Sequence, residues 1–420
     1  MTTRIGFVTR LKRAYAAYTL ADLDREMDQA ISGRPTFTGV DVSENSSLNY
    51  TAVYACVRVR AEALSSLSLH LYRRDGKTTE RATTHRLYRL LHDSPNEEMT
   101  AVELLETSQA HLDTWGNAYL WLDVPKMGRN AGYVQGIYPL KPDRVTPKRV
   151  KGRLQYDYRR QREDGSEEQV TYDLAEVLHV PGLGYDGVMG YSPVGMARQA
   201  IGMGLALEEF GARYFGQGTH PAGVMTNVAL PPGTSLDAFN AYLREQYQGL
   251  GKAHSIMTVT GDAKYQPLTM PLEDAQFLST RKFQLAEIAR IYRVPLHLIG
   301  ELDRATFSNI EMQALEFAMF TVMPLAKKWE KKLNLRLLTE REREQGYFFE
   351  FDLNSLMRGD NKSRGEFYRL MREVGAMSPN EIRERENLDP REGGDEFWDQ
   401  GPSGQGLTAQ TPSKESDPAG

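Results

Sequence analysis

The sequence has 420 residues, of which 40% are hydrophobic and 25% charged, and its formal net charge at pH 7 is −5. This length allows roughly two to four domains or one elaborate one, and the composition can build a packed core. A tight, sequence-independent binder of duplex DNA usually has a strong basic excess, which this chain lacks. The charge argues against a static nucleic-acid binder, although it is compatible with weak contact to sliding DNA.

Membrane insertion and secretion are not expected. Every apolar run is much shorter than the ~18 residues of a membrane helix. The four basic residues among the first 13 are not followed by an apolar segment, unlike those of a secretory signal. The single cysteine, Cys56, lies on the apolar side of a predicted helix, so we expect a buried structural thiol. The expected compartment is a reducing cytoplasm or a particle assembled there.

Organised structure is expected to follow a polar arm, residues 1–44. Apolar residues at helical spacing predict a helix over 51–66. The next residues alternate and predict a half-buried strand from Ser66 to Tyr72, with its leucines pointing inward and His70 outward. Asp75-Gly76 predicts a hairpin turn after this strand.

Two helices are predicted to precede a β-rich stretch. Thr84 is the predicted N-cap of the first, and Thr100 with Glu103 forms a capping box for the second. Alternating segments then predict further strands over residues 117–124, 133–139, 144–150, 154–161 and 168–173. Asp164-Gly165 adds a hairpin signal. Residues 67–180 therefore predict a mostly antiparallel β region with helices packed on it.

A glycine-rich segment, residues 182–190, follows this region. It lacks the spacing of a phosphate-binding loop, so we interpret it as a flexible hinge. Ser192 and Pro193 predict the start of a helix over 193–217, because proline is tolerated in the first turn. Each interior glycine of this helix costs about 1 kcal/mol relative to alanine. Gly202 and Gly204 therefore predict close approach to another backbone, such as that of a neighbouring helix.

Residues 219–270 show a β-α-β-β pattern and predict a small α/β module. Two long helices are predicted next, over 271–294 and 308–334, with a charged loop between them. Pro295 should end the first helix. Ser308 and Glu311 predict a capping box for the second, and Pro324 should kink it.

The remaining chain predicts one strand and two helices. The strand is expected over 347–353 and the helices over 360–374 and 379–388. Ser378 and Glu381 form a capping box for the last helix. The final residues, 401–420, are rich in Gly, Ser, Pro and Thr and are expected to be disordered.

No catalytic, cofactor-binding or metal-binding constellation is expected. Gly190-Tyr191-Ser192 resembles a nucleophile elbow, but valine occupies position 194, where the motif needs glycine. The eight histidines do not form a zinc-binding spacing. The charged loop allows two interpretations: Glu301, Asp303 and Arg304 form a solvated turn, or they project into a channel and contact a moving polyanion.

Several segments together resemble the portal proteins of tailed double-stranded DNA bacteriophages, of the long-tailed type. The similarity extends over roughly residues 45–395. The segments that carry it are Val53–Val57, Gly116–Tyr119, Asp186–Pro193, Glu287–Pro295, Ala305–Glu311, Ser378–Glu381 and Asn387–Pro390.

The resemblance implies an α+β fold: a portal-type multidomain ring subunit with a β-rich wing, a two-helix stem, a small α/β clip, a long kinked helix and a helical crown. The implied parts are a flexible N-terminal arm (1–44), the first part of the wing (45–190), a stem helix (191–218), the clip (219–270), a second stem helix (271–297), the tunnel loop (298–309), the second part of the wing (310–359), the crown (360–395) and a disordered tail (396–420).

The implied function is a ring-shaped channel at one capsid vertex, through which duplex DNA is packaged and later ejected. The implied partners are other copies of the chain, usually twelve in a ring, the DNA, the terminase large subunit, the major capsid protein and a head-completion or adaptor protein, with no membrane. The protein would act in the virion after assembly in the host cytoplasm. It would not be an enzyme, because the ATPase is the separate terminase. The implied DNA-facing residues are Glu301, Asp303, Arg304 and Thr306.

Two alternatives stay open at this point. The glycine-rich segment and scattered acidic residues could belong to an enzyme acting on phosphate esters, or the chain could be a capsid scaffold without a channel. An enzyme should be a small oligomer, whereas a portal should sediment as a large ring.

Overall fold

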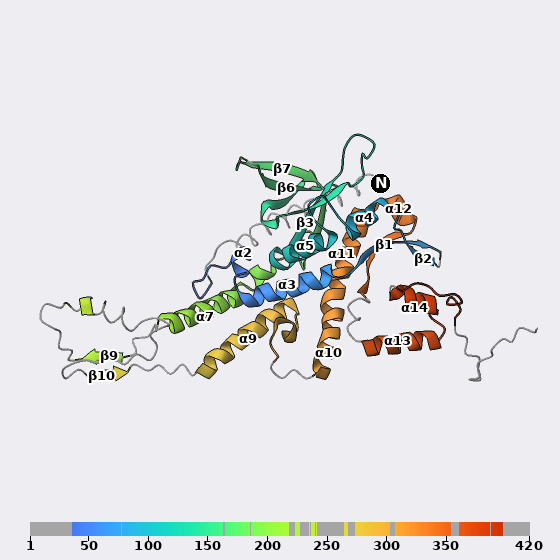
Figure 1. The fold of residues 1–420 in the computed structure, drawn as a ribbon. Helices are drawn as coiled ribbons and strands as arrows, with labels where there is room; N and C mark the ends of the chain where they lie inside the picture. The colour runs from blue at the N-terminus through green and yellow to red at the C-terminus, as the bar shows by residue number, and fades with distance from the viewer. Residues whose placement is uncertain are drawn as a thin grey trace, which may run out of the picture. The chain divides into compact units, whose positions relative to one another are not determined.

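The computed structural model describes residues 36–76, 78–162, 164–184, 186–217, 223–226, 235, 237–239, 241, 264–267, 274–302, 307–353, 361–386 and 388–397 (Figure 1). The chain forms two compact units, residues 1–352 and 353–420. Residues 1–35 of the predicted arm and the tail after residue 397 lie outside the described residues. The prediction of a flexible arm is wrong for residues 36–44, where Thr36 and Val42 are buried and Phe37 N donates to Gln199 Oε1 of a later helix at 3.0 Å.

Three helices form the centre of the first unit. Helix α3 (Thr51–Ser65) packs against α5 (Ala101–Trp115), and both helices begin and end close to where the sequence predicts. The predicted capping box is confirmed, since Thr100 Oγ1 accepts a hydrogen bond from Glu103 N at 3.3 Å. Helix α11 (Met323–Arg336) joins this core through Trp329, whose buried Nε1–H donates to Gln109 Oε1 at 3.0 Å. Cys56 is buried in α3, as expected, and burial raises its thiol pKa to about 12.

The first sheet joins segments far apart in the sequence. Its antiparallel order is β11-β1-β2, formed by β1 (Leu69–Asp75), β2 (Thr78–Arg81) and β11 (Tyr347–Phe351). The predicted hairpin between β1 and β2 is confirmed. The outward orientation of His70 is wrong: helix α4 (Arg86–His92) covers that face, and His70 stacks on its Tyr88 and His92 rings. The N-cap of α4 is His85 rather than Thr84, since His85 Nδ1 accepts from Leu87 N at 3.3 Å.

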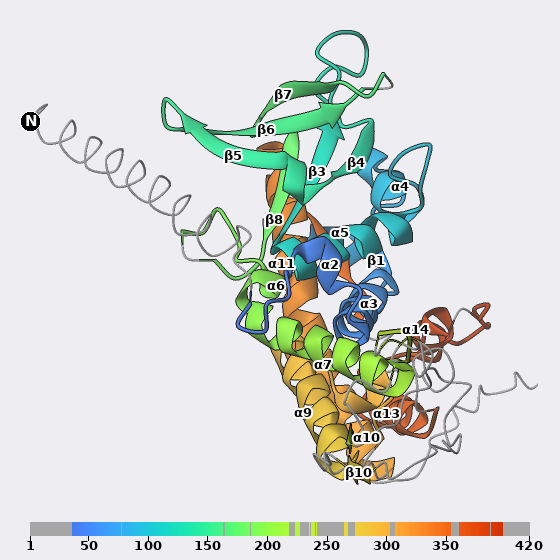
Figure 2. The same ribbon diagram turned by 90° about the vertical axis from the view of Figure 1, so that its left-hand side faces the viewer.

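Two further antiparallel sheets confirm the predicted β region (Figure 2). One has the order β4-β3-β8, with β3 (Asn117–Asp123), β4 (Gly136–Leu140) and β8 (Val177–Pro181). The other has the order β5-β6-β7, with β5 (Val145–Val150), β6 (Arg153–Gln161) and β7 (Glu167–Asp173). Strand β8 is absent from the sequence prediction. Buried side chains of both sheets share one core, which includes Tyr119 and Tyr156.

A buried polar network crosses this core. His179 Nε2 lies 3.0 Å from Asn117 Oδ1, and His179 Nδ1 lies 3.4 Å from the Tyr156 hydroxyl. Asn117 Oδ1 also accepts from Gly190 N at 2.8 Å. Burial, together with the positive charges of nearby Lys332 and Arg336, lowers the pKa of His179 to about 3. The imidazole is therefore neutral at pH 7, with Nε2–H donating to the asparagine and Nδ1 accepting from the tyrosine.

The glycine-rich segment is packed rather than a hinge, so that prediction is wrong. Gly182 N donates to Gly116 O at 2.7 Å, and a Cβ atom on Gly184 would lie 1.8 Å from Met189 O. Gly116 has φ of +74°, and its Cβ would lie 1.9 Å from Tyr191 O. At Gly116, Gly182 and Gly184 backbone contacts backbone, which leaves no room for side chains.

The helix predicted over residues 193–217 is interrupted at Ala197 and forms two helices. Ser192 caps α6 (Pro193–Met196) by accepting from Gly195 N at 2.9 Å, as predicted, and α7 (Arg198–Gln217) follows after Ala197. The expected close approach at its glycines is present, but the nearest atoms belong to side chains rather than to the backbone of a neighbouring helix. A Cβ on Gly202 would lie 2.6 Å from Thr36, and one on Gly204 would lie 2.4 Å from the Tyr50 ring. Both neighbours belong to the same chain.

Helix α7 packs against α9 (Asp274–Tyr292), with the predicted insert between them in the sequence. The described part of that insert is an antiparallel pair, β9 (Gly223–Thr226) with β10 (Lys264–Pro267), and a helical turn at 237–239. The second strand of the predicted β-α-β-β pattern, residues 255–260, lies outside the described residues.

The second long helix has three parts: α10 (Phe307–Phe317), a π-helical segment (Ala318–Val322) and α11. Met323 N bonds to Ala318 O, five residues back, immediately before Pro324. The kink at Pro324 stays a prediction, and the side chains of the predicted Ser308–Glu311 capping box lie outside the described residues. Helix α12 (Glu340–Glu344), which has its own capping box, was not predicted.

The second unit contains α13 (Asn361–Glu373) and α14 (Pro379–Arg385). The capping box predicted for the latter is confirmed: Glu381 N donates to Ser378 Oγ at 3.2 Å, and Ser378 N donates to Glu381 Oε2 at 2.8 Å. Tyr368 joins the two helices through a 2.7 Å hydrogen bond to Glu386.

A pair of glycine substitutions separates backbone strain from steric contact. Gly116 and Gly165 both have positive φ, but nothing lies within 4 Å of a Cβ on Gly165. We expect Gly165→Ala to lower the free energy of unfolding by about 1–2 kcal/mol, the cost of left-handed backbone. Gly116→Ala should cost clearly more, because its Cβ meets a carbonyl oxygen. Urea titrations of both variants measure the difference, and equal losses would contradict the close contact.

The buried His179 predicts loss of stability in acid. Its folded pKa of about 3 lies below the 6.5 of an exposed histidine, so between these values only the unfolded chain binds the proton. Stability should therefore fall as pH drops below about 6.5, by up to about 1.4 kcal/mol per pH unit from this group. We expect His179→Gln to be less stable at pH 7 but to lose less between pH 7 and 5. A pH series of urea titrations checks this, and parallel pH profiles would refute it.

Candidate functional site

The predicted site is the loop between α9 and α10. Of its four predicted residues, Asp303, Arg304 and Thr306 lie outside the described residues. Glu301 is half-buried at the start of the loop, and its Oε1 lies 3.9 Å from Lys282 Nζ on α9. That lysine side chain is about half exposed, at 53%, so the ion pair contributes little stability. What the structure defines is the base of the loop.

Helix α9 ends in a left-handed residue. Arg293 has φ of +53°, and Val294 N donates to Ala289 O at 2.9 Å, five residues back. This bond is typical of a Schellman motif, which usually places glycine at the left-handed position. Pro295 follows and begins a short 3-10 turn, η3 (Leu296–Ile299), which ends at Gly300 with φ of +88°. The prediction that α9 ends before Pro295 is confirmed.

Side chains from two other elements hold the last carbonyls of α9. Arg60 of α3 donates from Nη1 to Tyr292 O at 2.6 Å, and Thr321 of the π-helical segment donates to Arg293 O at 2.8 Å. The helix C-terminus leaves such carbonyls without partners, and its partial negative charge favours a cation there. The direction in which the chain leaves α9 is therefore fixed by residues outside the loop.

Arg60 is itself held by a buried carboxylate. Its Nε and Nη2 donate to the two oxygens of Asp113 on α5, at 3.0 and 2.7 Å. The arginine side chain is 13% exposed and the aspartate 3%. Such bidentate pairs are geometrically specific, so Arg60 connects α3, α5 and α9 in a fixed arrangement.

The far side of the loop is also connected to its base. His297 Nδ1 lies 2.8 Å from Gln313 Oε1, which links η3 to α10. Sequence reasoning found the loop but not Arg60, Asp113 or Thr321. The available signal was weak: each is a polar residue within an otherwise apolar helical face.

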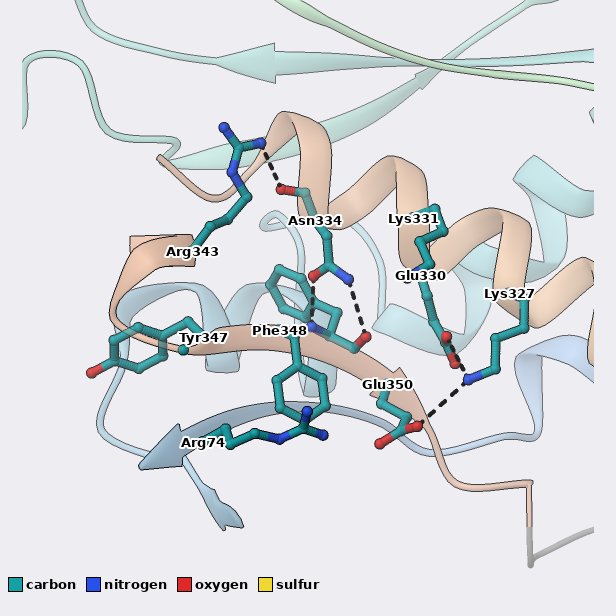
Figure 3. Close-up of a pocket in the computed structure, with 11 residues that line it drawn as sticks. Arg74, Lys327, Glu330, Lys331, Asn334, Arg343, Tyr347, Phe348 and Glu350 are labelled. Carbon is teal, nitrogen blue, oxygen red and sulfur yellow. Dashed lines mark hydrogen bonds and ion pairs between the residues drawn. The ribbon is translucent and has the colours of Figure 1, made fainter. Parts of the chain in front are cut away.

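A pocket of about 470 Å³ lies elsewhere, between α11 and β11 (Figure 3). Lys327 Nζ contacts Glu330 at 2.8 Å and Glu350 at 3.5 Å, and Asn334 Oδ1 accepts from Phe349 N at 2.7 Å. These polar groups are used to join the helix to the strand. The polar residues of this pocket therefore hold α11 against β11 rather than forming the nucleophile and base of a catalytic site.

In the part of the chain that the structure describes, the side chains of His, Cys, Asp and Glu do not gather in groups of three or more able to hold a metal ion. Within the same residues, every helix is too short or too polar to cross a membrane.

Comparisons with known sequences agree on one family. The sequence model described as phage portal protein matches residues 51–387. The portal protein of Enterobacteria phage HK97 is 29% identical over 401 residues, covering 94% of this chain and 92% of that protein. A probable portal protein of Streptomyces phage phiC31 is 32% identical over 374 residues, covering 85% and 79%.

Solved structures show the same fold. The neck of a native gene transfer agent particle with C12 symmetry contains a chain that aligns with a TM-score of 0.53 at 20% identity, covering 82% of this chain and 93% of that one. An HK97-family phage portal protein from Corynebacterium diphtheriae aligns with a TM-score of 0.50 at 16% identity, covering 75% and 96%. The predicted α+β portal fold is confirmed.

The extent of the sequence match decides the assignment. It covers most of the chain, including α3, the three sheets and the base of the loop between α9 and α10. The predicted function, a portal ring for DNA packaging in the virion, is confirmed with it. This chain belongs to the phage portal protein family.

Proposed function

We propose that twelve copies of this chain form the portal ring and that the loop between α9 and α10 faces the DNA in its channel. The observation that carries the ring proposal is an apolar stripe that runs along α10, the π-helical segment and the start of α11. Met312, Leu315, Met319 and Met323 follow one another at helical spacing and are 39–60% exposed in the single chain.

A contiguous exposed apolar surface of this kind marks an interaction site. A closed ring needs heterologous contacts, in which one patch meets a different patch on the next subunit. Phe283 and Ile291 on α9 are also exposed, at 59% and 40%, and offer apolar side chains for the opposing patch. The C12 symmetry of the related neck supports twelve copies.

We assign the parts of the chain by family resemblance. Residues 45–190 and 310–359 would form the wing, which the pairing of β1 with β11 supports. Residues 191–218 and 271–297 would form the stem, 219–270 the clip, 298–309 the tunnel loop and 360–395 the crown, with 1–44 and 396–420 as terminal extensions.

The tunnel loop would present Glu301, Asp303, Arg304 and Thr306 to passing DNA. The contacts of Arg60 and Thr321 support this role, because they hold the last carbonyls of α9, where the loop begins. The net charge of −5 suits a surface that lets DNA slide in both directions instead of gripping it.

The other partners follow from the same family. The clip would dock the terminase large subunit and later a head-completion or adaptor protein, and the wing would contact the major capsid protein. Assembly would take place in the host cytoplasm. The chain itself would catalyse no reaction, because the ATPase is the separate terminase.

Substitution within the apolar stripe tests ring formation. We expect Met319→Asp to prevent rings while the subunit stays folded, because a buried carboxylate in the interface lacks a partner. Met127→Asp is the matched control, since Met127 is 87% exposed in a loop outside the stripe. Native mass spectrometry measures the assembly and circular dichroism the fold. Rings of unchanged size from Met319→Asp would rule out the stripe as an interface.

Truncation of residues 301–306 tests the loop. We expect rings to form normally while packaging or retention of DNA falls, because the anchors at the loop base lie outside the removed segment. A Gly/Ser replacement of equal length keeps the reach of the chain and isolates the effect of the side chains. DNA content per particle is the measurement. Normal packaging and retention in the truncated form would exclude a role for the loop.

A further inference from the structure

Helix α11 has a second polar face, opposite the pocket of Figure 3. It borders a cleft of about 620 Å³ between the helix and the sheet of β5 and β6. Four cationic side chains line this cleft: Arg149, Arg153, Lys332 and Arg336. Among the described residues that line the cleft, Asp173 is the one carboxylate, and its Oδ1 accepts from Gln155 Nε2 at 2.9 Å.

The cations on the two faces of α11 differ in whether they form ion pairs. In the pocket of Figure 3, Lys327 contacts two carboxylates. In the cleft, Lys332 and Arg336 form no ion pair with any carboxylate among the described residues. The cation of the first face is therefore paired within the subunit, whereas the second face presents positive charge that the described carboxylates do not neutralise.

This charge is unfavourable without a ligand. Lys328, Lys332 and Arg336 follow one another at four-residue spacing, and like charges at this spacing repel one another and destabilise a helix. Lys332 is half-buried, and burial lowers its pKa, as do the neighbouring Arg336 and Lys328. A bound anion would neutralise this charge and relieve the repulsion.

The lining also indicates which anion fits. Half-buried apolar side chains, Leu154, Leu174 and Val188, lie beside the cations. A nucleic-acid backbone offers phosphates joined by sugars, and it carries no apolar side chain that could project between the leucines. A peptide can place a carboxylate against the cations and an adjacent apolar side chain against the leucines.

We propose that this cleft binds an acidic peptide segment of another protein, with a carboxylate held by Lys332 and Arg336 and a neighbouring apolar side chain on Leu154 and Leu174. The proposal goes beyond the channel function and does not depend on the number of subunits in the ring. Affinity should fall with added salt, because the contact is electrostatic.

A fluorescent peptide of alternating glutamate and leucine is a direct probe. Its binding to the full-length protein is measured by fluorescence anisotropy. We expect Lys332→Gln and Arg336→Gln each to weaken binding by roughly tenfold to a hundredfold, the range expected for losing a charge-assisted hydrogen bond. Both variants should fold, because the substitutions remove repulsion within the helix, and thermal melting verifies this.

The matched control is Lys331→Gln. Lys331 precedes Lys332 on the same helix but lines the pocket of Figure 3. The Lys331→Gln substitution should leave the affinity for the peptide unchanged, since Lys331 lies on the other face of α11. Equal losses from all three variants would show attraction to overall charge and overturn the proposal.

Two competitors complete the test. A peptide of alternating lysine and leucine should not displace the probe, which excludes binding through apolar contacts alone. A single-stranded DNA oligonucleotide of equal charge should displace it poorly. Stronger binding of the oligonucleotide, with the same dependence on Lys332 and Arg336, would overturn the peptide assignment in favour of a phosphate site.

Discussion

The contact on which the first unit most depends is the one between Arg60 and Asp113. Removing one partner of a buried ion pair typically costs about 3–5 kcal/mol, because the other charge is left without compensation. Here the loss would also free the carbonyl of Tyr292, which accepts from the same guanidinium. A single side chain thus joins two central helices to the start of the candidate DNA-facing loop.

Helix α11 has a comparable role at the other side of the core. Trp329 fixes it to α5, and its two polar faces meet different sheets. One face is neutralised by Glu330 and Glu350, and the other is not. One face of this short helix therefore holds it against its own subunit, whereas the other face forms the proposed binding surface for a partner.

Short sequence motifs predicted much of the fold, because helix caps and hairpin turns are stabilised by contacts between residues close in sequence. The capping boxes at Thr100 and Ser378 and the hairpin at Asp75-Gly76 depend on residues close in sequence. The errors arose where distant segments meet. His70 is buried by α4, and Gly202 contacts Thr36 across more than 160 residues, which no local pattern reveals. The candidate site shows the same limit. The charged residues of the loop indicated its position in the sequence, whereas the residues that hold its base lie on three separate elements and were not predicted.

The pairing of β1 with β11 has a consequence for how the chain folds. Leu69 pairs with Phe351. One edge of the β1–β2 hairpin therefore stays unpaired until β11, near the end of the first unit, has been synthesised. An isolated hairpin is marginally stable, and contacts of such long sequence separation form slowly. During synthesis this edge is an unpaired template for other strands. A crowded cell making many copies at once therefore exposes each nascent chain to strand exchange with its neighbours until residue 351 arrives.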